Sequence, residues 1–290
     1  MLISQSACKF LKRKDSINLG GELIDLTSPV VMGIVNVTPD SFYDGGKIES
    51  EQILLTMVEK MIADGVSIID VGAVSTKPGA LLPSVEVELE RLLPAVRAIR
   101  KEFHNVMLSI DTFRSWVAAR IIDEFGPVIV NDISGGSPEM FETAGKLGVP
   151  YVLSHIQGTP VNMQDNPEYD DVITDISRFF SEKIKKLTEH GVNDIIIDPG
   201  FGFGKKIEHN FELLNRLDSF KVFQLPVMVG LSRKSMICNA LDIKPKDALN
   251  GTTAANTIAL MGGADILRVH DVKEAIETVK IFCELKATLK

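Results

Sequence analysis

Residues 194–198 read DIIID, an isoleucine run that ends at an acidic residue, and the loop PGFGFGKK (199–206) follows directly. The same pattern, a short β-branched run that ends at a polar residue or glycine, recurs along the chain. The eight runs span 30–36, 67–72, 106–111, 128–132, 151–155, 194–198, 226–230 and 265–270. Segments with helical periodicity separate them. Strand and helix alternating in this way predict parallel strands joined by helical crossovers.

Eight strand-helix units in about 260 residues match the size of an α/β (β/α)8 TIM barrel. A doubly wound open sheet is the alternative, but no G-x-G-x-x-G turn follows the first strand. We therefore predict a single domain over 1–290, with a barrel in 30–290 and an N-terminal extension in 1–29. Within the extension, INLGGELIDL (17–26) predicts a β-hairpin around Gly20 and Gly21 that closes the N-terminal end of the barrel.

Two helices show how clear the helical pattern is. The helix between the first and second strands is predicted to stop at Gly65. The helix between the second and third strands is predicted to begin after the N-cap Ser84. The expected core face of the first helix comprises Ile53, Leu54, Met57, Val58, Met61 and Ile62.

Composition excludes several classes of protein. The net charge is −8, whereas nucleic-acid-binding domains usually carry a basic face. No apolar run reaches the roughly 18 residues of a membrane helix, and the N-terminus lacks the order of a secretory signal. The three cysteines, Cys8, Cys238 and Cys283, are far apart and lack metal-site spacing. We expect a cytoplasmic protein with reduced thiols.

The ends of the eight strands carry polar side chains or glycine. In a barrel the carboxyl ends of all strands converge on one mouth, where the chemistry of this fold takes place. The strand ends are, in order, Asn36, Gly72, Asp111, Asn131 with Asp132, His155, Asp198, Gly230, and Arg268 with His270. Caps and turns explain one or two such residues but not the whole series, so we predict a functional site at this mouth.

The strand-end residues divide by charge into two groups. Asp111, Asn131 and Asp198 suit a flat heterocycle that offers several N–H donors and ring acceptors. Lys234 with Arg233, and then Arg268 and His270, suit an anion such as pyrophosphate. The amide oxygen of Asn36 can hold Mg²⁺ when the phosphates of a substrate supply most of the charge.

The loop PGFGFGKK resembles a phosphate cradle at first sight. It lacks the G-x-x-x-x-G-K-[ST] spacing of a P-loop, and its strand does not lead tightly into a helix. We expect its glycines to let the backbone turn closely over the mouth. Lys205 and Lys206 are left without a clear role, and we expect the phosphates across the mouth, between Asn36 and Arg268.

A set of motifs in fixed order carries a family resemblance. They are VMGIVNVTPDSFYDGG, IDVGAVSTKPGA, SIDT, VNDISGG, HIQGTP, IIIDPGFGFGK, GLSRKS and NGTTAANTIALMGGADILRVHDV. Together they resemble the dihydropteroate synthases, folate-pathway transferases that join a pterin to p-aminobenzoate. The resemblance covers the chain from residue 17 onward.

The resemblance implies a role for each matching residue. Asp111, Asn131, Asp198 and Lys234 match the pterin pocket, and Asn36, Arg268 and His270 match the Mg²⁺–pyrophosphate site. Residues that match contacts to p-aminobenzoate are Thr76, Lys77, Pro78, Phe203 and Ser235. Asp40 lies on the first of two loops that close over the substrates, and Lys77 lies on the second. A homodimer through the last helices is also implied.

The resemblance further implies a reaction of 6-hydroxymethyl-7,8-dihydropterin pyrophosphate with p-aminobenzoate, which gives dihydropteroate and pyrophosphate. An SN1-like path suits the weak aniline nucleophile. Asp40, Asp198, Lys234, Arg268 and His270 are the expected catalytic residues. Three positions depart from the family: Lys77 stands where arginine is common, Val74 where an acid is common, and Ser154 where methionine is common. We expect these departures to affect p-aminobenzoate or sulfonamides and to leave the ring and pyrophosphate residues untouched.

Three other functions are compatible with a barrel of this kind. A corrinoid-dependent methyltetrahydrofolate methyltransferase would need no pyrophosphate site, which Arg268 and His270 argue against. A non-catalytic pterin-binding homologue would have lost mouth residues that are present here. A metal hydrolase would use His155, His270, Asp111 and Asp198 as ligands, but no H-x-H pair follows the first strand.

Overall fold

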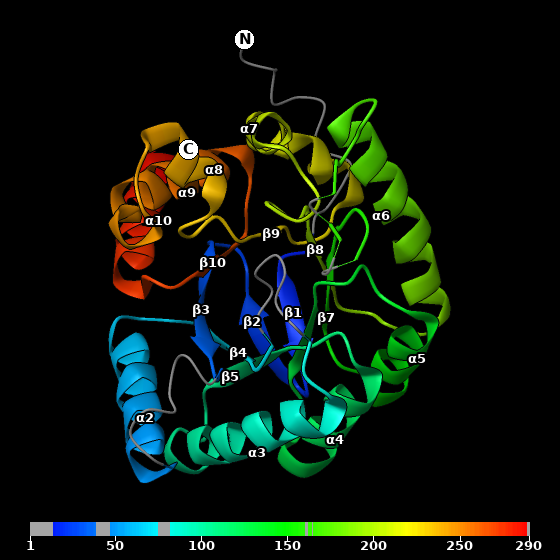
Figure 1. The fold of residues 1–290 in the computed structure, drawn as a ribbon, viewed down its shortest axis with the longest axis vertical. Coiled ribbons are helices and arrows are strands. Elements are labelled where there is room, and N and C mark those ends of the chain that lie inside the picture. The colour runs from blue at the N-terminus through cyan, green and yellow to red at the C-terminus, as the bar shows by residue number, and fades with distance from the viewer. Residues whose placement is uncertain (1–13, 39–46, 75–81, 160–161, 164, 289–290) are drawn as a thin grey trace.

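The computed structural model describes residues 14–38, 47–74, 82–159, 162–163 and 165–288. Eight parallel strands form one sheet in the order β8-β7-β6-β5-β4-β3-β10-β9. A parallel bridge between Ile197 and Val227 joins the two outer members of this order and closes the ring. The predicted (β/α)8 barrel is confirmed (Figure 1).

The barrel strands coincide with the eight sequence runs to within a few residues. Their bounds are β3 (Val30–Asn36), β4 (Ile68–Gly72), β5 (Met107–Asp111), β6 (Ile129–Asp132), β7 (Tyr151–Ser154), β8 (Ile195–Asp198), β9 (Met228–Val229) and β10 (Ile266–Val269).

Helices surround the strands in the described part of the chain (Figure 1). They are α2 (Lys47–Ala63), α3 (Val85–Glu102), α4 (Ser115–Phe125), α5 (Pro138–Leu147), α6 (Val172–Glu189), α7 (Ile207–Asn215), α8 (Ser235–Leu241), α9 (Leu249–Gly262) and α10 (Val272–Ala287), with short 3₁₀ turns at η1 (Leu217–Phe223) and η2 (Pro245–Asp247). None of the helices described is both long and apolar enough to cross a bilayer.

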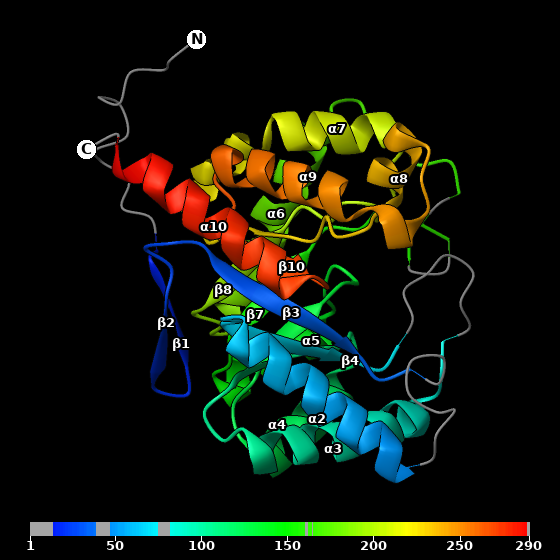
Figure 2. The same cartoon turned by 90° about the vertical axis from the view of Figure 1, so that its left-hand side faces the viewer.

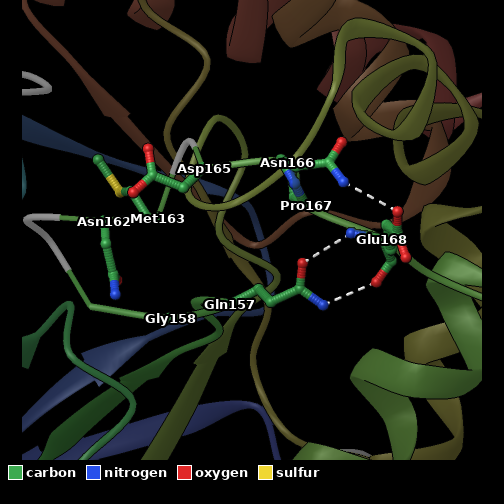
Figure 3. A pocket seen from close by; sticks show the side chains of 8 residues that line it. All are labelled: Gln157, Gly158, Asn162, Met163, Asp165, Asn166, Pro167 and Glu168. Atoms are coloured by element: carbon green, nitrogen blue, oxygen red, sulfur yellow. Dashed lines mark hydrogen bonds between the residues drawn. The ribbon is translucent and has the colours of Figure 1, made fainter.

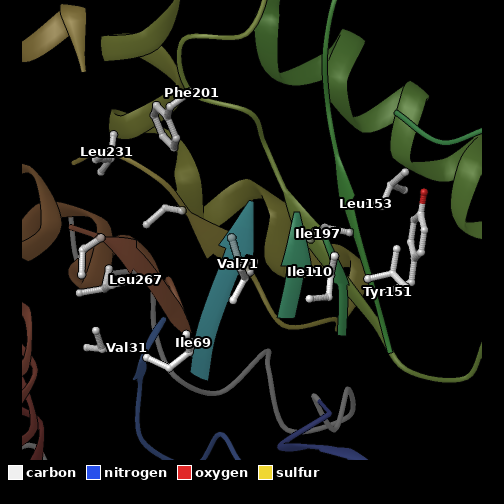
Figure 4. Close-up of a cluster of buried hydrophobic side chains, with 14 of the residues drawn as sticks. Val31, Ile69, Val71, Ile110, Tyr151, Leu153, Ile197, Phe201, Leu231 and Leu267 are labelled. Carbon is white, nitrogen blue, oxygen red and sulfur yellow. The ribbon is translucent and has the colours of Figure 1, made fainter. Parts of the chain in front are cut away.

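Side chains alternate between the two faces of each strand, and the outward ones form the main core. Val31, Ile69, Val71, Ile110 and Leu267 are fully buried between the strands and the helix ring (Figure 4). Because both faces of a parallel barrel sheet are covered, the strands read as continuous apolar runs and do not alternate in polarity. This explains why the eight runs were recognisable in the sequence.

The predicted hairpin is present as β1 (Ser16–Leu19) paired antiparallel with β2 (Glu22–Asp25). Gly20 and Gly21 both have positive φ at its turn, a conformation that glycine adopts at little cost. The hairpin lies at the end of the barrel where β3 begins (Figure 2). Its buried side chains join the inward residues of the strands in a second apolar cluster: Ile17, Leu19, Ile24, Leu26, Met32, Ile68, Ile129, Val152, Ile196, Met228 and Ile266. The hairpin therefore closes the N-terminal end, as predicted.

The predicted helix ends at Ser84 and Gly65 are confirmed, but the predicted core face of α2 is partly wrong. Ser84 caps α3 by accepting a hydrogen bond from the backbone N–H of Val87. Gly65 has positive φ and ends α2 by donating to the carbonyl of Ile62. On α2, Leu54 is buried, but Ile53 and Ile62 are exposed. The buried stripe is narrower than the sequence suggested, because only one side of α2 faces the barrel.

Candidate active site

A polar layer lies directly above the apolar floor inside the barrel. It consists of the residues two positions after the floor residues: Asp70, Ser109, Asn131, Ser154, Asp198 and Arg268. A period of two returns the side chain to the same face of a strand, so these residues also point inward. A rim follows after two further positions, with Asn36, Gly72, Asp111 and His270. Most of the predicted strand-end residues are thus brought together at one mouth. Asp132 and His155, which directly follow the inward residues Asn131 and Ser154, turn to the other face, where Asp132 accepts a hydrogen bond from the Tyr151 hydroxyl at 2.6 Å and His155 packs against Phe179.

Arg268 joins three strands of this polar layer. Its Nε lies 2.7 Å from Asp70 Oδ2, and its Nη2 lies 2.6 Å from the same oxygen. Nη2 also donates to Asp111 Oδ2 at 2.7 Å. Asn131 donates through Nδ2 to Asp70 Oδ2 at 3.1 Å. The carboxylate of Asp70 therefore holds both Arg268 and Asn131 in place.

Asp111 is an acid at the mouth whose pKa is raised. Burial raises its pKa, the neighbouring Arg268 lowers it and the charge of Asp70 raises it, and the result is a pKa of about 7. A carboxyl group that changes charge near neutral pH at a barrel mouth indicates a functional position.

Asp198 lies on the opposite side of the polar layer. Its Oδ1 accepts a hydrogen bond from the backbone N–H of Gly200 at 2.8 Å. The hydroxyl of the fully buried Ser154 lies 3.5 Å from its Oδ2. The departure at Ser154 therefore contacts a predicted ring-binding residue, which corrects the expectation that the departures leave these residues untouched.

Lys234 reaches the mouth from the start of α8. Its Nζ donates to the carbonyl oxygen of Phe201 and lies 4.5 Å from the centre of the Phe203 ring. Burial lowers the pKa of Lys234 to about 8, with Asp198 opposing and Arg268 assisting the shift. Lys234, Phe203 and Asp198 thus form one group around the loop 199–206.

His270 and Arg233 lie at the rim, and burial followed by the charge of Arg268 lowers the pKa of His270 to about 4. The backbone N–H and Nδ1 of His270 lie 3.3 Å and 3.1 Å from the hydroxyl of Ser232. Arg233 has positive φ and makes two hydrogen bonds to Asp271, at 2.9 Å and 2.6 Å. Arg233 is therefore engaged beside the mouth, while Ser235 is exposed next to Lys234.

Several expected residues cannot be placed. Asp40, Thr76, Lys77 and Pro78 lie outside the described residues. Conversely, the sequence reasoning overlooked Asp70, which is fully buried and contacts Arg268. Counting two residues from the floor position Ile68 would have found it.

A polar hollow of about 390 Å³ lies beside the mouth, in the segment between β7 and α6. Figure 3 shows its lining, in which Gln157 and Glu168 exchange two hydrogen bonds, at 2.7 Å and 3.0 Å. None of the predicted substrate residues lines it. The segment packs against the loop 199–206, where Tyr169 donates to the carbonyl of Gly204 at 2.7 Å. We interpret the segment as a support for that loop.

Comparison with known proteins gives a consistent result. The sequence pattern of the pterin binding enzymes matches residues 32–270. The dihydropteroate synthase of Escherichia coli K12 is 46% identical over 272 residues, which cover 93% of this chain and 95% of the relative.

Two solved structures are similar over nearly their whole length. The dihydropteroate synthase of Yersinia pestis, in complex with a sulfonamide drug, has a TM-score of 0.87 at 41% identity and covers 94% of this chain and 99% of its own. That of Xanthomonas albilineans with 4-aminobenzoic acid has a TM-score of 0.87 at 35% identity, with 94% and 98% covered. The family match over residues 32–270 and the 46% identity over nearly the whole chain show that the chain belongs to the pterin binding enzymes, in the family of the dihydropteroate synthases.

Proposed function

We propose that this barrel condenses 6-hydroxymethyl-7,8-dihydropterin pyrophosphate with p-aminobenzoate, which gives 7,8-dihydropteroate and pyrophosphate. The observation that carries the proposal is the meeting of Asp111, Asn131, Asp198 and Lys234 at one mouth. Two acids, an amide and a cation offer acceptors and donors in the mixture that a flat pterin requires.

The pterin ring is assigned to the inner layer of the mouth. Its N–H groups would donate to Asp111 and Asp198, and its acceptors would face Asn131 and Lys234. Ring donors that take over Asp111 would compete with Arg268, which contacts that carboxylate at 2.7 Å. We infer that pterin binding releases Nη2 of Arg268, while Asp70 still holds the same guanidinium.

The pyrophosphate is assigned to the space between Asn36 and His270 of the rim and Arg268 of the polar layer, which come from the neighbouring strands β3 and β10. No cluster of three or more metal-binding side chains occurs among the described residues. Asn36, in the partly exposed end of β3, offers one amide oxygen, which fits Mg²⁺ only if phosphates and water complete the shell. Bound there, Mg²⁺ would supply Lewis-acid stabilisation of the leaving group.

The p-aminobenzoate is assigned to the outer part of the mouth, beside Phe203 and Ser235, with Thr76, Lys77 and Pro78 as further contacts. Phe203 is partly exposed and Ser235 is exposed, so both are accessible to a ligand. We propose that sulfonamides, which resemble p-aminobenzoate, compete for this position.

The reaction is proposed to begin with loss of pyrophosphate. Arg268 and His270 stabilise the charge that develops on the leaving group. Asp198 accepts ring N–H donors and so favours the cation that forms on the pterin methylene. Asp40 stabilises that cation, and p-aminobenzoate then attacks through its amine.

One assay tests the function and its order of steps. The protein is mixed with dihydropterin pyrophosphate, Mg²⁺ and p-aminobenzoate, and dihydropteroate is measured. A folded preparation that forms no product would overturn the function. If C–O cleavage in the closed enzyme depended absolutely on p-aminobenzoate, the SN1-like path would be wrong while the function stood.

We also propose a homodimer through α9 and α10, which lie side by side on the outer surface (Figure 2). Ile258, Met261, Ile281 and Leu285 on these helices are 49 to 72% exposed. Apolar side chains gathered on one surface favour association. Light scattering of the wild type and of Ile281→Lys tests this, because the charge should yield monomers.

A further inference from the structure

Lys205, the first lysine after the glycine-rich loop, is only 4% exposed. Its Nζ makes three hydrogen bonds, and none of them involves a carboxylate. The partners are His155 Nδ1 at 2.9 Å, the carbonyl of Gly200 at 2.9 Å and the carbonyl of Phe203 at 3.1 Å. A buried cation is costly unless its donors are used. Here all three donors of the ammonium group have partners.

Because these donors are used inside the protein, Lys205 has none left for a phosphate. The adjacent Lys206 is exposed and shares none of these contacts. The sequence analysis assigned no role to either lysine. The structure distinguishes them by burial, because Lys205 is buried and Lys206 is exposed. Lys205, which follows the glycines, therefore holds the loop together through hydrogen bonds inside the protein.

Along the loop, backbone groups that bond to Lys205 alternate with backbone groups that bond to the proposed substrate-binding residues. Gly200 donates its N–H to Asp198 at 2.8 Å, and its carbonyl accepts from Lys205. The next carbonyl, that of Phe201, accepts from Lys234. The carbonyl of Phe203 accepts from Lys205, while its ring lies against Lys234. Displacement of this backbone would therefore move three proposed substrate residues together.

The backbone of the loop also packs closely against the segment after β7. A Cβ atom on Gly200 would lie 1.9 Å from the carbonyl oxygen of His155, and one on Gly204 would lie 2.5 Å from that of Gln157. The backbone can approach this closely only as glycine. The contact from Lys205 to His155 joins the two segments at the point of closest approach.

The chemistry of His155 agrees with this arrangement. Nδ1 of His155 lies 2.9 Å from Nζ of Lys205, and the ring tautomer sets the direction of this hydrogen bond. When Lys205 is the donor, His155 is neutral and carries its proton on Nε2. Burial, and next the charge of Lys205, hold the pKa of His155 well below its usual range. His155 therefore serves as a neutral acceptor at the end of β7.

We propose that Lys205 is a positioning residue of the synthase reaction, which holds the loop 199–206 against His155 and thereby places Asp198, Phe203 and Lys234 for the pterin. The inference rests on the proposed function. It differs from a phosphate-binding role in one measurable way. The loss of Lys205 should weaken binding of the ring and spare binding of the anion.

The test compares Lys205→Met with Lys206→Met, which make the same chemical change at a buried and an exposed position. Calorimetry measures binding of 6-hydroxymethylpterin and, separately, of inorganic pyrophosphate. We expect Lys205→Met to weaken pterin binding about tenfold or more and to leave pyrophosphate binding unchanged, with Lys206→Met close to wild type for the pterin.

Two results for Lys205→Met would overturn the inference. One is pterin binding equal to that of Lys206→Met in a folded protein. The other is selective loss of pyrophosphate binding, which would make Lys205 a phosphate ligand. Wild-type protein that binds no pterin would overturn the proposed function and this inference with it, so the two failures are distinguishable.

A second pair of variants keeps the inference testable if Lys205→Met does not fold. His155→Asn retains an acceptor oxygen close to the position of Nδ1, whereas His155→Leu removes the acceptor. We expect His155→Asn to bind pterin nearly as well as wild type and His155→Leu to reproduce the loss. Equal pterin affinities for the two variants would contradict the proposed link.

Discussion

Arg268 and Asp70 form a buried ion pair across the barrel, with Nε and Nη2 of the arginine 2.7 Å and 2.6 Å from one carboxylate oxygen. The pair joins β10 to β4, which are separated in the sheet by β3. The second oxygen of Asp70 has no hydrogen-bond partner in the described structure. A buried oxygen in that state suits a bound water. Asp70 thus holds Arg268 from below, while Asp111 contacts the same guanidinium at the mouth.

Asp70→Asn should destabilise the protein. The change leaves Arg268 with Asp111 as its remaining carboxylate contact, and breaking a buried pair costs about 3 kcal/mol or more. Asp64→Asn is the control, since Asp64 pairs with the mostly exposed Lys60 and its loss should leave the free energy of unfolding close to that of wild type. Urea unfolding measures both. Equal losses would show that the buried pair contributes no more than a surface one.

The pH dependence of kcat/KM should be bell-shaped. Asp111, whose pKa is raised to about 7, gains its charge as the pH rises and then accepts ring donors. Lys234, whose pKa is lowered to about 8, loses its charge as the pH rises further. Activity should therefore rise through the first value and fall through the second, because kcat/KM reports the free enzyme. Asp111→Asn should abolish the rising limb. A variant that kept this limb would remove Asp111 as its source.

The hairpin should contribute stability without contributing to chemistry. Ile17 is fully buried in the apolar floor, so Ile17→Ala should lower the free energy of unfolding by about 2 to 4 kcal/mol. Leu23, in the same hairpin, is 67% exposed, and Leu23→Ala should stay within about 0.5 kcal/mol of wild type. Both should keep wild-type kcat below their unfolding temperatures. A low kcat in folded Ile17→Ala would mean that the floor also shapes the polar layer.

Asn36→Ala should mainly affect the response to magnesium. The variant lacks the amide oxygen at the end of β3 but retains the proposed ring-binding residues. We expect a higher Mg²⁺ concentration for half-maximal turnover, and unchanged affinity for 6-hydroxymethylpterin. A titration of turnover with Mg²⁺, together with calorimetry of the pterin, checks both expectations. An unchanged Mg²⁺ response would remove the metal assignment of Asn36.

The sequence predicted the barrel well because each strand is a run of β-branched residues and each run ends at a polar residue or glycine. It did not reveal Asp70, which lies two residues before the end of β4 in a run that reads as an ordinary buried strand. Only the inward direction of its side chain, a property of the closed barrel, makes it part of the site.

Burial was the second property that the sequence did not determine. Lys205 and Lys206 are chemically identical neighbours, yet one is buried and the other exposed. The difference arises because the loop folds back onto His155, a contact between residues 50 positions apart. Likewise, Ile53 fits a helical apolar pattern but is exposed, because the width of the buried stripe depends on how α2 is set against the barrel.

Gly200→Ala tests whether the close approach of the loop to β7 is needed to form the site, beyond the cost of a left-handed alanine. Gly200 has a φ of 72°, and an added Cβ would lie 1.9 Å from the carbonyl oxygen of His155. Gly191→Ala is the matched control, since Gly191 has a φ of 85° with no atom within 4 Å of the added Cβ. The control should cost only the left-handed conformation, about 1 kcal/mol, and keep full activity. Gly200→Ala should cost more and lower kcat/KM about tenfold or more, because relief of the clash moves the carbonyls that hold Lys205 and Lys234. Unfolding curves and steady-state kinetics of the two variants decide the question. If Gly200→Ala matched the control in both, the close approach of the loop to β7 would have no part in forming the site.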